Sequence, residues 1–196
     1  MRNVAKMLLL AAMFIAACTN EKEPAENAVA KTEATLNSIR PDAQQYAAEQ
    51  LQTVEASVNR MKQDLAKKDY SAVVRAVPSV NSDLETLKTA TETAKSDAEA
   101  MLAAAQSEWN ELNTSVPPMV EKLQARVDQL TKSRKYPKGM DKAAFEAAKT
   151  SFESVKAEWT EAGAEYASGQ AANAVRKARG TKAKAEELMT QLEVKA

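Results

Sequence analysis

The side chains of this chain that could do chemistry are limited by two counts: one cysteine and no histidine among 196 residues. Without histidine, no serine or cysteine nucleophile can be paired with an imidazole base. The sequence also contains neither a glycine-rich phosphate loop nor the ligand spacing of an EF-hand. Any metal site would need carboxylates alone, and acidic residues on helix faces are typically solvated. We therefore predict that the protein is not an enzyme and holds no metal or catalytic cofactor.

The cysteine ends an apolar stretch that follows a short basic segment. Arg2 and Lys6 precede the apolar run 7–17, an order typical of a secretory signal peptide. The run is too short to span a bilayer, which takes about 20 apolar residues. We expect residues 1–17 to be a signal peptide that is removed by cleavage before Cys18.

The residues around this cysteine, Ile15-Ala16-Ala17-Cys18, resemble the lipobox of bacterial lipoproteins. The resemblance implies transfer of diacylglycerol to the Cys18 sulfur, cleavage between Ala17 and Cys18, and N-acylation of the new N-terminus. Two or three acyl chains anchor a protein stably, because each buried methylene contributes about 0.8 kcal/mol. Thr19 stands where an aspartate would signal inner-membrane retention, which favours the outer membrane facing the periplasm. The alternative is an ordinary cleaved signal with an incidental cysteine.

Two basic clusters stand out in a chain whose 27 basic and 27 acidic side chains balance. They are predicted to form local positive patches for the phosphates of an envelope lipid or for an acidic protein. The alternative is a solvated loop and a solvated helix face. The candidate patch for an anionic ligand comprises Lys132, Arg134, Lys135, Lys138, Arg176, Lys177, Arg179, Lys182 and Lys184, with Lys142 beside the first cluster.

Aromatic side chains recur at helical spacing in the C-terminal half of the chain. Core packing explains such a stripe. The alternative is a groove near Trp109 or Trp159 that takes an apolar ligand or a partner helix. The set comprises Trp109, Phe145, Phe152, Trp159 and Tyr166.

The elements that must position these side chains are helices. Glycine is scarce, helix-forming residues are abundant, and apolar residues recur every three or four positions. Pro41 and the segment 113–118 are expected to interrupt helices, and Pro78 to kink or split one. A polar stretch, 19–27, looks like a flexible tether. The expected helices are 27–39, 42–67, 69–113, 117–134, 141–167 and 170–194, with Met101 on the buried stripe of the third.

These elements predict an all-α fold, an elongated antiparallel bundle of about five helices. The expected domains are the signal peptide, a lipid-anchored tether over 18–40 with a possible short helix, and a helical bundle over 41–196. A shift of 101 residues also places one apolar stripe on another, although any two helical hairpins share this periodicity. The overlay sets Leu51, Val54, Val58, Met61 and Leu65 on Phe152, Val155, Trp159, Ala162 and Tyr166. It predicts two duplicated hairpins joined by a middle helix.

These features together predict a lipid-anchored protein of the bacterial cell envelope, without catalytic activity. It would act as a helical interaction or scaffold module, held at the membrane by Cys18, with an envelope protein or a second copy of itself as partner. The alternative is a binding or carrier protein for envelope lipid or glycan, which would use the basic patches or an aromatic-lined groove. Balanced charge argues against a nucleic-acid partner.

Overall fold

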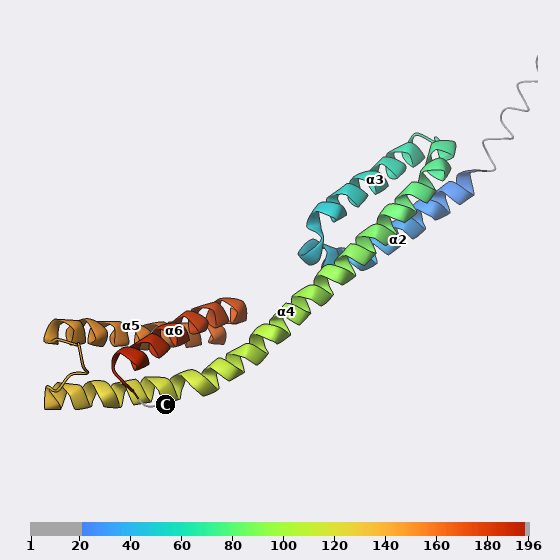
Figure 1. Cartoon of the computed structure of the whole chain (residues 1–196). Helices are drawn as coiled ribbons and strands as arrows, with labels where there is room; N and C mark the ends of the chain where they lie inside the picture. The colour runs from blue at the N-terminus through green and yellow to red at the C-terminus, as the bar shows by residue number, and fades with distance from the viewer. Residues whose placement is uncertain (1–20, 195–196) are drawn as a thin grey trace, which may run out of the picture. The chain divides into compact units, whose positions relative to one another are not determined.

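The computed structural model describes residues 21–194, and this part of the chain contains five helices and no strand. The predicted all-α fold is confirmed. The helices are α2 (Lys22–Tyr46), α3 (Ala48–Ala66), α4 (Tyr70–Ser133), α5 (Lys142–Ala167) and α6 (Ala171–Gln191), as labelled in Figure 1.

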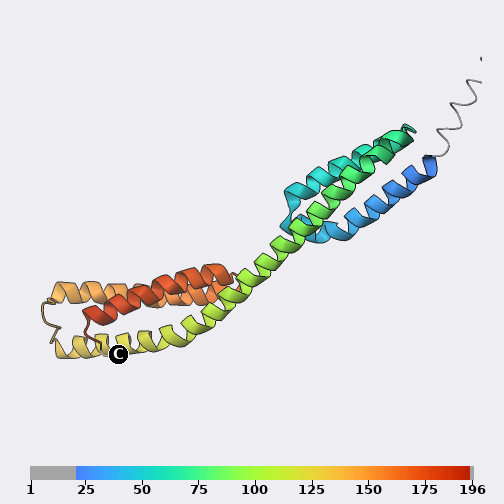
Figure 2. The same cartoon turned by 45° about the vertical axis from the view of Figure 1, so that its right-hand side comes forward.

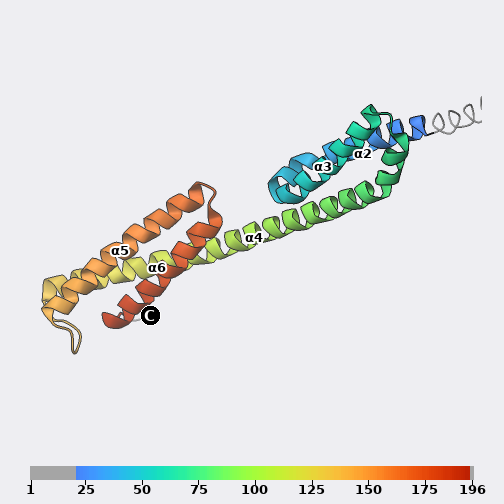
Figure 3. The same ribbon diagram turned by 90° about the horizontal axis from the view of Figure 1, so that it is seen from above.

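The chain divides into two compact units, and the long helix α4 contributes to both. The first unit is Met1–Ala98 and the second is Glu99–Ala196. In the first, α2 and α3 pack together with the N-terminal part of α4 (Figure 2). In the second, α5 and α6 run side by side and pack with the C-terminal part of α4 (Figure 3). The predicted bundle domain, 41–196, therefore contains the whole second unit and only residues 41–98 of the first, and its expected boundary falls inside α2.

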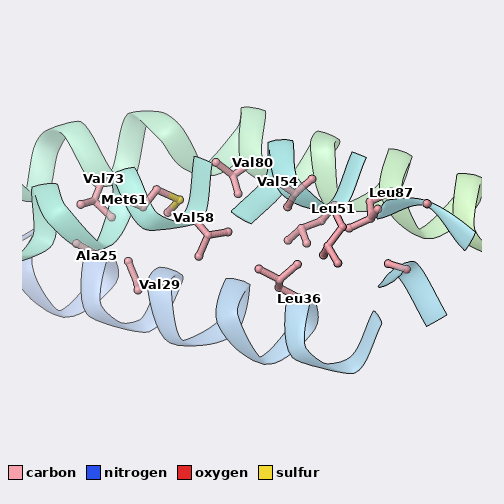
Figure 4. Close-up of a cluster of buried hydrophobic side chains, with 13 residues drawn as sticks. Ala25, Val29, Leu36, Leu51, Val54, Val58, Met61, Val73, Val80 and Leu87 are labelled. Carbon is pink, nitrogen blue, oxygen red and sulfur yellow. The ribbon is translucent and has the colours of Figure 1, made fainter. Parts of the chain in front are cut away.

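The first unit is held together by small aliphatic side chains on one stripe of each helix. Val29 and Leu36 of α2 point toward Leu51 and Val58 of α3, and Leu87 of α4 lies beside them (Figure 4). Burying a side chain of this kind stabilises the fold by about 1.5–3 kcal/mol. The cluster comprises Ala25, Val29, Leu36, Ala43, Ala47, Leu51, Val54, Val58, Met61, Val73, Val80, Leu84 and Leu87.

The second unit has two clusters, and both draw on α4, α5 and α6. Phe145 and Phe152 are fully buried in one cluster, and Trp109 is buried in the other. The first of these clusters comprises Leu123, Val127, Leu130, Phe145, Ala148, Phe152, Val155, Ala185, Leu188 and Leu192. The second comprises Trp109, Leu112, Val116, Ala162, Ala174, Val175 and Ala178.

The predicted helix breaks at Pro41 and over residues 113–118 are wrong, and Pro78 does not split its helix. Pro41 lies inside α2, and α4 continues through Pro78 and through residues 113–118. An interior proline costs about 3 kcal/mol or more, because it removes one backbone hydrogen bond and crowds the preceding turn. Here the buried side chains of Leu112 and Val116 hold the helix on the core side of the prolines at 117 and 118. Tertiary packing outweighs the local cost.

The prediction of a flexible tether over residues 19–27 is also wrong for residues 22–27, which belong to α2. Ala25 and Val29 begin the buried stripe of this helix, and they pack against α3 and α4. The break that was expected at Pro41 occurs instead at Ala47, whose φ of −146° and ψ of 43° separate α2 from α3.

The two turns that the shift of 101 residues aligns have the same backbone conformation. The turn from α3 to α4 and the turn from α5 to α6 each leave the helical conformation through one left-handed residue, Lys68 (φ 64°) or Gly169 (φ 84°). Lys68 N–H donates to the carbonyl of Leu65, and Gly169 N–H donates to that of Tyr166, at 2.9 and 3.0 Å. All of these positions differ by 101 residues. The predicted middle helix is the C-terminal part of α4.

Candidate functional site

The aromatic stripe in the second unit closes on itself. Trp109 of α4 stacks on Trp159 of α5 with ring centroids 5.5 Å apart, and on Tyr166 with centroids 4.5 Å apart. Stacked pairs of this kind stabilise a fold beyond the area that they bury. Trp109 is only 7% exposed. The three rings therefore occupy the space in which an apolar ligand was considered, and they act as core.

The basic cluster on α6 is largely neutralised by acidic side chains from other helices. Lys177 contacts Glu161 and Glu165 of α5, at 3.0 and 2.7 Å. Arg179 forms a two-point contact with Glu108 of α4. The remaining contacts are Lys184 with Glu158, Lys182 with Glu186, and Arg176 with Asn173. Most cations of this run therefore form ion pairs with acidic side chains of the second unit.

This network shifts the pKa of its members in the direction that keeps them charged. The hydrogen bond from Arg179 holds the pKa of Glu108 below its ordinary value. A hydrogen bond from Lys184, supported by Ser154, lowers the pKa of Glu158. The pKa of Lys177 is raised, first by its hydrogen bond to Glu165 and then by that to Glu161. Charges satisfied in this way are poor candidates for binding an external anion.

The other predicted cluster surrounds the connection between α4 and α5, which we call the basic loop (residues 132–142). Its cations are all exposed, and within residues 21–194 none of them forms an ion pair. They are Lys132 in the last turn of α4, then Arg134, Lys135 and Lys138 in the connection, and Lys142 at the start of α5.

The backbone of the basic loop is anchored to the second unit. Tyr136 stacks on Phe145 with ring centroids 4.9 Å apart, and Pro137 is buried. Asp141 caps α5 by accepting a hydrogen bond from the Ala144 N–H at 2.8 Å. Arg134 ends α4 in the left-handed conformation (φ 54°), where glycine would cost less. The loop thus displays unpaired cations from a fixed base.

The structure also exposes an apolar pair that the sequence pattern missed. Met101 was expected on the buried stripe of its helix, but its side chain is 73% exposed, and that of Leu102 is 48% exposed. Both lie on α4, ahead of the turn at which Trp109 meets α5. A continuous helix with adjacent apolar residues gives no local sign of where its packing partners begin, so only the structure could reveal this exposure.

The remaining site predictions have no geometry to report. Cys18, together with the cleavage site at Ala17, lies outside the described residues.

Within residues 21–194, there is no cluster of three or more acidic, cysteine or histidine side chains that could hold a metal ion. In the same residues, no helix is both long and apolar enough to cross a membrane. Comparisons with protein-family models, curated proteins and solved structures find no match to this chain.

Proposed function

We propose that the chain is a lipid-anchored protein of the bacterial cell envelope and serves as a non-catalytic interaction module. The observation that carries the proposal is the lipobox-like sequence Ile15-Ala16-Ala17-Cys18, behind Arg2, Lys6 and an apolar run. In this proposal Cys18 carries the acyl chains, and the outer membrane facing the periplasm is the favoured location. The helical units are the part that meets other envelope components.

The fold supports this proposal through the position of its first helix. Only Thr19, Asn20 and Glu21 separate Cys18 from Lys22, the first residue of α2. Four residue steps span at most about 14 Å. A lipid on Cys18 would therefore hold the first unit close to the bilayer surface, as expected of a scaffold with a fixed attachment point.

The interaction role is supported by the apolar pair on α4. Met101 and Leu102 expose adjacent large apolar side chains on a helix whose neighbouring residues are also solvent-accessible. Exposed apolar side chains are the kind of surface that a protein partner covers, although two residues form a small patch. The partner in this proposal is an envelope protein or a second copy of this chain.

The lipid anchor is tested by intact mass. The membrane-extracted protein should exceed the mass of the polypeptide 18–196 by the mass of several acyl chains. Cys18→Ala should abolish that increment. A mature species with the bare polypeptide mass would contradict the anchor.

The interaction role is tested by crosslinking in cells followed by affinity purification. A protein recovered with the wild type should be lost with the double variant Met101→Glu/Leu102→Glu. The control is Val74→Glu, which adds a single negative charge at another exposed apolar residue of α4, one that is 37% exposed. Equal recovery from both variants would show that the apolar pair is not the contact.

A further inference from the structure

The basic loop contains the longer of the two connections that precede the repeated hairpins α3–α4 and α5–α6. The first unit joins α2 to α3 through Ala47 alone, whereas the second joins α4 to α5 through residues 134–141. The helices that follow, α3 and α5, end 101 residues apart in equivalent turns. The two units therefore differ in this connection, and the cations of the basic loop belong to the second unit alone.

Net positive charge is concentrated in the basic loop. Residues 132–142 contain five basic side chains and one acidic side chain, a net charge of +4. The rest of the described chain, 21–131 and 143–194, carries 19 basic and 26 acidic side chains, a net charge of −7. The single acid of the loop, Asp141, uses one carboxylate oxygen to cap α5. The loop is therefore a positive segment, and the rest of residues 21–194 carries a net negative charge.

The charges of the loop are also available, in contrast to those of α6. Lys177, Arg179 and Lys184 face carboxylates on neighbouring helices. Within the described residues, Lys132 and Lys138 have no such partner, nor do the other cations of the loop. A long polar side chain that is not held by an ion pair can turn toward an external anion without breaking an internal contact.

We propose that the basic loop is a membrane-docking surface for the phosphate headgroups of anionic phospholipid. Exposed, mostly lysine charges distributed over residues 132–142 suit a charged surface. One small anion would instead need convergent donors in a cleft. Tyr136 and Met140 of the same loop are half-buried, and their remaining surface is suited to the interface below the headgroups. The inference deepens the proposed function by adding a second membrane contact, but the loop would bind without a lipid on Cys18.

The test is co-sedimentation of unlipidated chain 18–196, with Cys18→Ser, with vesicles. This chain retains all five described helices, and its failure to bind would leave the lipid-anchor test unaffected. We expect binding to vesicles with 30–40% phosphatidylglycerol, on the order of tenfold or more above binding to neutral phosphatidylcholine vesicles, and loss of that difference at about 0.5 M salt. Equal sedimentation with both vesicle types would overturn the proposal.

The site is assigned by two variants that remove the same number of charges. Lys132→Gln/Arg134→Gln/Lys135→Gln/Lys138→Gln should weaken binding to anionic vesicles at least about tenfold. Arg176→Gln/Lys177→Gln/Arg179→Gln/Lys182→Gln should weaken it less than about threefold, because those cations already face acidic or amide partners. Equal losses would show that net charge alone drives binding.

Three further measurements test the assignment of the binding site to the basic loop. Circular dichroism should show unchanged helicity, and the smaller variant Lys135→Gln/Lys138→Gln should give an intermediate loss even where a quadruple variant folds poorly. Inorganic phosphate at the ionic strength of a sodium chloride control should compete no better than chloride. Preferential competition by phosphate would replace the membrane surface with a site for a small anion.

Discussion

The two units repeat one hairpin but differ in what fills it. A shift of 101 positions sets Leu51 and Met61 of α3 on Phe152 and Ala162 of α5, and all four are buried. Val58, which is also buried, corresponds to the stacked Trp159. The buried pattern is shared, whereas the side-chain volumes are not. The hairpin geometry therefore depends on which positions face inward, and aliphatic or aromatic side chains satisfy it equally well.

The turns of the two units share a backbone conformation but differ in the residue that adopts it. Lys68 and Gly169 occupy the same left-handed position with the same backbone hydrogen bonds. Glycine adopts this conformation freely, whereas lysine pays a conformational cost. The first unit tolerates that cost because α3 and α4 are held by their core on both sides of the turn.

The largest expected effect separates the cores of the two units. Phe152→Ala should lower the free energy of unfolding of the second unit by about 4 kcal/mol, and Leu51→Ala should lower that of the first by about 3 kcal/mol. Both tryptophans, Trp109 and Trp159, lie in the second unit. Tryptophan fluorescence during urea unfolding should therefore shift with Phe152→Ala alone, while circular dichroism detects both variants. A fluorescence shift of equal size with Leu51→Ala would show that the units unfold together through α4.

Smaller effects are expected from substitutions of the two turn residues, and the effects on the two units should have opposite signs. Lys68→Gly should raise the stability of the first unit by up to about 1 kcal/mol, since it relieves the left-handed conformation of a residue with a Cβ. Gly169→Ala should lower that of the second by about 1 kcal/mol. No atom lies within 4 Å of a Cβ placed at Gly169, so the cost is conformational alone. Thermal melts followed by circular dichroism and fluorescence measure both changes, and a loss of stability with Lys68→Gly would contradict the equivalence of the turns.

The smallest expected effect is a pH dependence of the second unit. The folded pKa values of Glu108 and Glu158 lie below their ordinary carboxyl value, so both groups stabilise the fold above it. That contribution is lost as the pH falls from 4.5 through the lower folded pKa values. Lys177 has a raised pKa, so its contribution is complete below 10.5 and is lost as the pH rises through the higher folded value.

The measurement is the urea midpoint of the tryptophan transition between pH 3 and pH 7. Glu108→Gln should flatten the acid limb of this curve. Glutamine does not titrate, so the variant lacks the carboxyl whose pKa Arg179 lowers in the folded state. Glu26→Gln serves as the matched control, since Glu26 forms an exposed pair with Lys22 in the first unit. An acid limb that is unchanged in Glu108→Gln would exclude the Arg179 contact as its cause.

Much of the fold could be predicted from local pattern. The turns near residues 68 and 169 were predictable because the apolar stripe stops and polar residues or glycine follow. The continuity of α4 was not predictable, since Pro78, Pro117 and Pro118 are locally unfavourable, and only packing against other helices offsets them. Met101 was assigned to a buried stripe for the same reason: periodicity identifies a helix face but does not say whether another helix covers it.

The candidate site divides in the same way. Both basic clusters are visible in the sequence, but their difference is not. Arg179 meets Glu108 across 71 positions of sequence, and Lys184 meets Glu158 across 26. No local pattern predicts such partners. That Lys135 has no ion-pair partner among residues 21–194 is likewise visible only once the neighbouring helices are in place.

The sequence by itself determined the helical class, the inward-facing stripes and the turns that repeat after 101 residues. Each of these follows from interactions between residues three or four positions apart, or from the conformational preference of a single residue. Tertiary structure decided that α4 is continuous and that the chain packs as two units. It also decided that most cations of α6 face acidic side chains, whereas those of residues 132–142 form no ion pair within the described chain. Those outcomes depend on side chains distant in sequence, and their energies exist only once the helices pack against one another.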